Sequence, residues 1–284
     1  MPASLHSRPR LLRAAASTRS AVSNSVPALQ QCLDELPCHS LHEVGALALM
    51  NRFDTKYLLP QAQLPELLWQ LKQDYSVLCI EGKRLMRYRN VYFDTRDFGL
   101  YGLHHNKRKS RFKVRLRTYL DSATSFLEIK SKNNKDMTDK QRQAIETPEL
   151  ESCLTQTLPR NVVPLSADPL SACVDICYER ISLQSMKHHE RVSIDIGLCA
   201  RPVGAARSFQ LEGMAIVELK QGRLNRESPL YTAMKHLGCR PQSFSKYCMA
   251  CASLFPETLK TNAFKPVLAR LSSHIALFNG AVHA

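Results

Sequence analysis

Cations alternate with apolar residues along two neighbouring stretches of this 284-residue chain. Residues 111–117 read RFKVRLR and residues 126–132 read FLEIKSK, so charged side chains recur at every second position. A period of two is typical of β-strands, whose successive side chains point to opposite faces. One face of the first predicted strand carries only cations: Arg111, Lys113, Arg115 and Arg117. Such a row can bind phosphate groups, because guanidinium and ammonium groups donate charge-assisted hydrogen bonds.

The same alternation recurs along most of the other predicted strands. The charged residues involved are Arg52, Asp54, Lys56, Arg87, Arg89, Glu128, Lys130, Lys132, Lys140, Arg142, Arg180, Arg191, Asp195, Glu218 and Lys220. A solvent-exposed sheet face explains any single strand, because exposed faces also alternate. It explains the set poorly, because cations dominate strand after strand and like charges opposite each other on a sheet are destabilising.

A barrel with its charged faces turned inward accounts for the whole set. Its apolar faces would pack outward against helices, and its polar, cationic interior would form a tunnel. Buried unpaired cations are costly, so such a tunnel requires an anionic ligand, and phosphate groups suit arginine through paired hydrogen bonds. The few carboxylates lie near cations of the same face, as Glu128 does beside Lys130. They would hold a divalent metal ion that bridges phosphate oxygens.

The net charge of +14 favours an anionic partner: nucleic acid, phosphate polymer, nucleotide or acidic lipid. The chain lacks GxGxxG and GxxxxGK[ST], which excludes Rossmann and P-loop nucleotide sites. Nucleic acid is not expected, because single-strand binders interleave aromatic residues with the basic face. Here Tyr88 and Tyr92 alternate opposite Arg87 and Arg89. No run of about 18 apolar residues occurs, so no segment is expected to span a membrane.

Three regions follow from the composition. Residues 1–40 are rich in Ser, Ala and Arg and predict a disordered basic extension, with a targeting peptide as the lesser alternative. Residues 41–258 form the β-rich domain, with helices expected near residues 61–74, 228–238 and 243–254. Residues 138–146 fit a strand or a helix equally, and residues 259–284 form a tail that adds a helix. The ten cysteines are expected to be reduced, in a cytoplasmic setting. The predicted fold class is therefore α+β, with many antiparallel strands and peripheral helices.

Several segments, in this order, resemble a known family. They are RFDTKY, VYFDT, RLRTY, LEIKSK, ERIS, RVSIDIGL, IVELKQG and SFSKY, and they span residues 41–255. Together they resemble the VTC domain, the polyphosphate polymerase domain of the triphosphate tunnel metalloenzyme, or CYTH-like, superfamily. The resemblance implies a closed tunnel of about eight antiparallel strands. It also implies an enzyme that transfers the terminal phosphate of ATP to a growing polyphosphate chain with Mn²⁺ or Mg²⁺.

The resemblance assigns roles residue by residue. The positions that match phosphate-binding residues of the family are Lys56, Arg115, Arg117, Lys130, Arg180, Arg191 and Lys246. Of these, Arg115, Arg117, Lys130 and Lys246 are expected to act on the reacting phosphates. One of Lys140 and Arg142 matches a basic patch, and Glu218 matches the metal-binding glutamate. The strand alternation adds Arg52, Arg89 and Lys220 as phosphate-binding candidates, and Asp54 and Asp195 as further metal ligands.

One departure bears on the activity. Hydrolases of the superfamily carry ExExK on the first strand, whereas this chain has Arg52, Asp54 and Lys56 there. The loss of one carboxylate leaves fewer metal ligands, which favours a polymerase over a two-metal triphosphatase. A tunnel triphosphatase and a non-catalytic polyanion-binding module stay open as alternatives. The sequence shows neither the regulatory SPX domain of some family members nor a transmembrane segment. A role at the inner face of a membrane would therefore require a membrane-protein partner.

Overall fold

The computed structural model describes residues 28–45, 53–132, 138–146 and 169–279. Its centre is a twelve-stranded sheet in which every pair of neighbours is antiparallel except β1 and β3. One path through it runs β2-β11-β9-β8-β4-β5-β6-β7. These strands are β2 (Phe53–Pro60), β11 (Met214–Gln221), β9 (Glu190–Pro202), β8 (Ser171–Ser185), β4 (Met86–Asp94), β5 (Arg111–Tyr119), β6 (Thr124–Lys132) and β7 (Thr138–Ile145).

Four shorter strands extend this path at its sides. β10 (Arg207–Leu211) pairs with the end of β9, and β12 (Ile275–Asn279) pairs with β10. β3 (Tyr75–Leu78) pairs with the end of β8, and β1 (Cys38–His39) pairs with β3. The ambiguous segment at residues 138–146 is the strand β7, because it pairs with β6 along its whole length.

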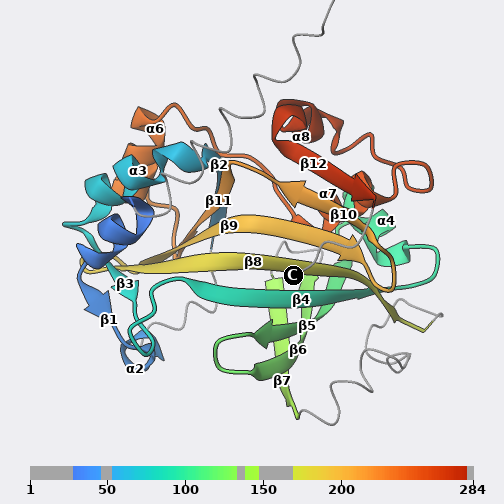
Figure 1. Cartoon of the computed structure of the whole chain (residues 1–284), viewed down its shortest axis with the longest axis horizontal. Coiled ribbons are helices and arrows are strands. Elements are labelled where there is room, and N and C mark those ends of the chain that lie inside the picture. Colours follow the sequence, from blue (N-terminus) through green and yellow to red (C-terminus); the bar gives the residue numbers. More distant parts are fainter. Residues whose placement is uncertain (1–27, 46–52, 133–137, 147–168, 280–284) are drawn as a thin grey trace, which may run out of the picture.

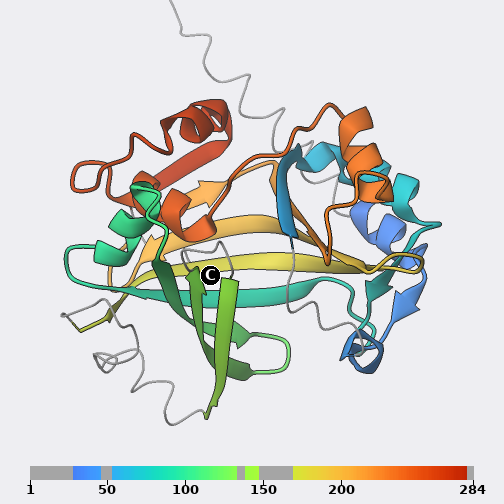
Figure 2. The same cartoon turned by 180° about the vertical axis from the view of Figure 1, so that it is seen from behind.

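The sheet curls strongly but does not close. Figures 1 and 2 show β5, β6 and β7 descending at a steep angle from the long strands β4, β8 and β9. β7 pairs only with β6 and β2 only with β11, so the two ends of the path share no ladder in the described part of the chain. The predicted closed barrel is wrong in this respect. Side chains span the gap instead, since Lys130 Nζ on β6 lies 3.8 Å from Asp54 Oδ2 on β2.

The outer face of β2, β11, β9 and β8 packs against helices, as predicted. α3 (Leu64–Leu71) turns its leucines inward at a helical spacing, and α6 (Pro229–His236) lies beside it. A helical segment at residues 28–34 joins the same core. Residues fully buried there include Leu33, Leu67, Ile194, Val217 and Met234. Burial of such side chains contributes about 1.5–3 kcal/mol each and holds the strands that carry the charged positions.

A second core lies on the opposite face of the sheet. α7 (Lys246–Leu254) packs there against β8, β9 and β10, and its Tyr247 ring stacks on Tyr92 of β4 at 4.8 Å. The Ser245 hydroxyl caps α7 by accepting a hydrogen bond from the Cys248 amide. α4 (Gly99–His105) and α8 (Lys265–Arg270) contribute to the same core. α7 therefore covers one end of this face and leaves the remainder to the charged residues.

The ends of the chain differ from expectation. Residues 28–45 contribute the helical segment at residues 28–34, β1 and α2 (Leu41–Gly45), so the ordered domain begins before the boundary predicted at residue 41. The part of the expected disordered extension at residues 1–27 lies outside the described residues. The predicted tail does contain a helix, α8, and it adds the strand β12 as well. Across the described ranges, every helix is too short or too polar to cross a membrane.

Candidate active site

The strand register gathers the predicted charged residues on one face of the sheet. Residues directly opposite each other on paired strands share a face. Arg115 lies opposite Glu128, which lies opposite Arg142. Two positions along, Lys113 lies opposite Lys130, and Lys130 lies opposite Lys140 on β7. These side chains belong to the same face as Tyr92 of β4.

The long strands carry the other half of this face. Arg180 on β8 lies opposite Asp195 on β9. Glu218 on β11 lies between Lys56 on β2 and Ser193 on β9. Lys220, likewise, lies between Asp54 and Arg191. We call the face that carries all these residues the interior face.

Cations outnumber carboxylates on the interior face of the described chain. Its carboxylates that contact cations are Asp54, Glu128, Asp195 and Glu218. Its cations are Lys56, Arg111, Lys113, Arg115, Arg117, Lys130, Lys132, Lys140, Arg142, Arg180, Arg191, Lys220 and Lys246. Like charges at this density repel one another in a partly buried space. The protein alone therefore leaves the interior face with an excess of positive charge.

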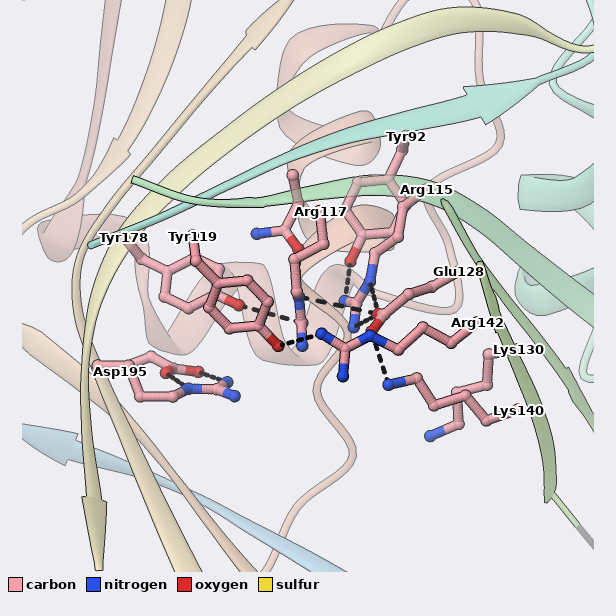
Figure 3. A network of polar contacts seen from close by, with 12 residues as sticks. Tyr92, Arg115, Arg117, Tyr119, Glu128, Lys130, Lys140, Arg142, Tyr178 and Asp195 are labelled. Atoms are coloured by element: carbon pink, nitrogen blue, oxygen red, sulfur yellow. Dashed lines mark hydrogen bonds and ion pairs between the residues drawn. The ribbon is translucent and has the colours of Figure 1, made fainter. Parts of the chain in front are cut away.

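Glu128 is the centre of the first cluster, shown in Figure 3. Its side chain is only 2% exposed, and Arg115 donates to Oε2 through Nε at 2.9 Å and Nη2 at 2.7 Å. Lys140 Nζ lies 2.6 Å and Arg142 Nε 3.9 Å from Oε1, and Arg117 Nε lies 3.8 Å from Oε2. Burial alone would raise the pKa of Glu128, but the charges of Arg115, Arg117 and Lys140 lower it to about 2. One carboxylate thus orients cations from β5 and β7.

Arg117 links the two halves of the interior face. Its Nε donates to Asn90 Oδ1 at 3.0 Å, and its Nη2 donates to the Tyr178 hydroxyl at 3.4 Å. Tyr178 stacks on Tyr88, and the Arg180 guanidinium lies over both rings at 5.3 and 5.1 Å. Burial raises the pKa of Tyr178, but the nearby charges of Arg180 and Arg117 outweigh it and lower the pKa to about 8. The stacked tyrosine rings therefore separate the guanidinium groups of Arg117 and Arg180, whose like charges repel each other.

Asp195 is the centre of the second cluster. It is 1% exposed and accepts from Arg180 Nε at 2.5 Å and Nη2 at 2.8 Å. Lys246, the first residue of α7, forms an ion pair with the same carboxylate. Burial alone would raise the pKa of Asp195, but Arg180 and Lys246 lower it strongly. Helix α7 thereby positions Lys246 beside residues that lie far away in the sequence.

Glu218 makes longer cation contacts than Glu128 and Asp195 do. Its nearest cations are Lys220 at 3.6 Å and Lys56 at 3.8 Å. Both lysines donate hydrogen bonds elsewhere: Lys220 to Ser193 Oγ at 2.8 Å, and Lys56 to the Phe244 carbonyl at 3.0 Å. Burial alone would raise the pKa of Glu218, but Lys220 and Lys56 lower it well below its usual range. Glu218 is therefore ionised, with oxygens able to take a further ligand.

One predicted phosphate-binding residue, Arg89, lies apart from this site. Arg89 is on the opposite face of β4, where it binds Asp175 at 3.0 Å, so its predicted place in the interior is wrong. The alternation on β4 predicts the wrong inward face: Tyr88 and Tyr92 point inward, while the exposed Arg87 binds Asp121. Aromatic rings thus do accompany the cations, contrary to expectation. Arg52 lies outside the described residues.

The sequence model of the VTC domain matches residues 51–255. The chain belongs to the VTC domain family. Its resemblance to that family is thereby confirmed, and the interior face lies within the matched residues. A search of curated proteins found no match.

Solved structures share parts of the fold at low identity. A Hippeastrum protein described with a dominant triphosphatase activity is 14% identical, with 74% of this chain and 99% of that chain covered and a TM-score of 0.48. A candidate adenylate cyclase from Vibrio parahaemolyticus is 12% identical, with 70% and 98% covered and a TM-score of 0.44. The protein PH1819 from Pyrococcus horikoshii is 12% identical, with 71% and 99% covered and a TM-score of 0.41. These likenesses assign no activity to this VTC domain.

The carboxylates of the VTC domain fit a single metal ion whose other ligands would come from the substrate and from water. No group of three or more His, Cys, Asp or Glu side chains converges on one point within the described ranges. Asp195 is saturated by Arg180 and Lys246, whereas Glu218 keeps coordination capacity because its cation contacts are long. Mg²⁺ and similar ions bind through one or two carboxylates when phosphate oxygens and water complete the shell. Glu218 therefore fits the role predicted for it. Asp195 is engaged by Arg180, and Asp54 lies as far from Lys130 as Glu218 lies from Lys56, at 3.8 Å.

Sequence reasoning missed the partners of Glu128 and the interior residue Tyr178 of this VTC domain. Glu128 was assigned to Lys130 on its own strand, but it binds Arg115 and Lys140 on the neighbouring strands, and Lys130 reaches Asp54 instead. Tyr178 was not singled out, although it lies two positions before Arg180 on the same strand face. The period of two could have identified Tyr178, but the partners of Glu128 depend on a register that alternation within one strand does not contain.

Proposed function

We propose that this VTC domain transfers the terminal phosphate of ATP to the end of an inorganic polyphosphate chain. Family membership supports a phosphoryl-related tunnel enzyme, and the excess of cations over carboxylates on the interior face carries the proposal. Triphosphate and polyphosphate have the charge density to neutralise that excess. Nucleic acid is disfavoured because the interior cations line a curled sheet partly covered by α7 rather than an open surface.

Substrate binding uses groups that the carboxylates have already oriented. Arg115 and Arg117 on β5 grip the triphosphate from one side, and Arg180 on β8 grips it from the other. Lys246 orients the terminal phosphate, and Lys56, Lys130, Arg191 and Lys220 bind the remaining phosphates, with Lys140 and Arg142 at the β7 edge. Each cation lies on a strand or at a helix start, so little reorganisation is needed when charge shifts among the phosphate oxygens.

The transfer itself requires no side-chain nucleophile. A terminal oxygen of the polyphosphate chain forms a bond to the γ-phosphorus, the bond to the oxygen that bridges the β- and γ-phosphates breaks, and ADP leaves with that oxygen. Glu218 would hold a divalent ion, Mn²⁺ or Mg²⁺, which when bound would supply positive charge to the phosphates. The arginines stabilise the charge that spreads over the transferred group.

Product analysis tests this proposal. Purified protein incubated with ATP and Mn²⁺ is expected to form long chains, visible on a polyphosphate-staining gel, together with ADP. Glu218→Gln is expected to lower chain formation at least about 100-fold, because it removes the charge that holds the ion. Retained folding is checked by thermal unfolding. Unchanged turnover in Glu218→Gln would contradict the proposed ligand.

The same experiment separates the alternatives. A triphosphatase would release free phosphate without chains, since water would replace the polyphosphate end as acceptor. A non-catalytic module would bind polyphosphate without metal and without turnover. The tight pairing of Asp195 with Arg180 and Lys246 leaves fewer interior carboxylates for metal ions, which favours the polymerase over a hydrolase that needs two. A membrane-protein partner stays a prediction that this experiment does not address.

A further inference from the structure

Lys113 is an interior lysine to which neither the family resemblance nor the mechanism above gives a role. It lies on β5 between Arg111 and Arg115, on the same face, directly opposite Lys130. Lys130 on β6 lies 3.8 Å from Asp54 on β2, and Lys56 follows Asp54 on the same face of β2, so lysines from three strands lie near one another. Among the described residues, Lys113 has no ion pair and no side-chain hydrogen bond.

The groups that face Lys113 from β4, α7 and α4 do not supply it with an anion, and Asp54 and Glu218 contact Lys130 and Lys56 instead, each at 3.8 Å. The nearest carboxylate position on β4 is Asp94, whose oxygens accept hydrogen bonds from the Leu100 and Tyr101 amides and from the Tyr247 hydroxyl. On α7, burial raises the pKa of the Cys248 thiol, which is therefore neutral near pH 8. On α4, burial and the charge of Lys113 lower the pKa of His104 to about 3, so that ring is neutral as well.

We infer that Lys113 binds a phosphate group of the substrate and completes a subsite with Lys56 and Lys130 at the end of the interior face next to α7. The inference rests on the proposed phosphate-binding function. Three converging ammonium groups repel one another, and a phosphate between them removes the repulsion and gives each a charge-assisted hydrogen bond. Lys113 is thus a binding residue beyond those matched to the family.

Lys113 also makes binding sensitive to alkaline pH. Burial, with the charges of Lys56, Lys130 and Arg115, lowers the pKa of Lys113 to about 8 in the absence of ligand. A bound phosphate favours the charged form and raises that pKa, so above pH 8 the lysine must take up a proton in order to bind. Affinity contributed by Lys113 is therefore full below pH 8 and falls as pH rises through the ligand-free pKa. Arginine at this position stays charged throughout and would remove the effect.

Calorimetric titration of the full chain with inorganic tripolyphosphate, without metal and at fixed ionic strength, tests this inference. Between pH 7 and pH 9.5, the affinity of the wild type is expected to fall roughly 30-fold relative to that of Lys113→Arg. The comparison cancels the titration of the ligand and of the other lysines. At pH 7, Lys113→Gln is expected to bind roughly 10- to 100-fold more weakly than wild type. The exposed Lys235 of α6 provides the matched control, because Lys235→Gln removes the same charge from the surface.

The binding results for the Lys113 variants can be told apart from the results of the polymerase assay. Parallel pH profiles for the wild type and Lys113→Arg would overturn the inference, as would equal affinities of Lys113→Gln and Lys235→Gln at pH 7. Both readouts concern binding alone, so they keep their meaning if no chains form from ATP. Absence of polymer with the predicted pH difference would refute the polymerase and leave the Lys113 subsite standing. If Lys113→Gln does not fold, the arginine comparison decides alone.

Discussion

Replacing Arg115 with alanine is expected to slow polyphosphate formation by about 100- to 1,000-fold. The Arg115 guanidinium donates to Glu128 through Nε and Nη2 and to the Tyr92 hydroxyl through Nη1. Arginine has five N–H groups. Three of them hold the guanidinium group in place, and two stay available for phosphate oxygens. Alanine removes both the charge and the preorganised donors. The measurement is the initial rate of ADP and polymer formation at saturating ATP and Mn²⁺.

Arg201 provides the matched control for this substitution. It too is an arginine on a strand of the same sheet, bound at 3.2 Å to a buried carboxylate, Asp175. That pair lies on the opposite face, and Asp175 keeps Arg89 as a partner when Arg201 is removed. Arg201→Ala is therefore expected to change the rate by less than about twofold, as for a surface substitution. Equal losses in the two variants would show that global charge or stability, rather than the interior face, controls the rate.

Replacing Glu128 with glutamine is expected to lower the free energy of unfolding by about 3–5 kcal/mol. The substitution leaves the cations around a 2% exposed position without their shared anion. Added tripolyphosphate is expected to stabilise Glu128→Gln more than the wild type, because the ligand then replaces the missing charge. Urea unfolding at pH 7, with and without tripolyphosphate, measures both effects. Glu212→Gln, in an exposed turn, is the control and is expected to shift stability by less than about 0.5 kcal/mol.

The stability contributed by Glu128 has a defined pH range. The carboxyl pKa is about 2 in the folded protein, below its ordinary value of 4.5. A lowered pKa means that the contribution is present above pH 4.5 and is lost as pH falls through the folded value. The wild type should therefore lose more stability than Glu128→Gln between pH 5 and pH 2. The same loss of unfolding free energy in the two proteins between pH 5 and pH 2 would contradict the assigned role of Glu128.

Alternation within single strands predicted a large part of the fold. The period of two identified β5 and β6 with their charged faces, and the leucine spacing identified α3. It could not identify which face of β4 turns inward, because Arg87 and Arg89 alternate with tyrosines that are equally good strand residues. Packing decided the matter: Tyr88 and Tyr92 bury their rings against Tyr178 and Tyr247, and the arginines stay near water.

Long-range placement accounts for the rest of the site. Lys56 and Lys246 come together with Glu218 and Asp195 only through the pairing of β2 with β11 and the docking of α7. The family resemblance supplied these residues, but no local pattern brings residues from the two ends of the chain to one face. Closure of the barrel failed as a prediction for the same reason, because alternation contains no information on whether the two edge strands meet.

The crystal structure of the protein with tripolyphosphate tests most directly whether the cations of the interior face enclose the substrate. The phosphate groups are expected between β5 and β8, with oxygens within hydrogen-bond distance of Arg115 and Arg180 and a terminal group beside Lys113. Well-occupied tripolyphosphate on the outer arginines Arg89 and Arg201, with an empty interior face, would contradict the account.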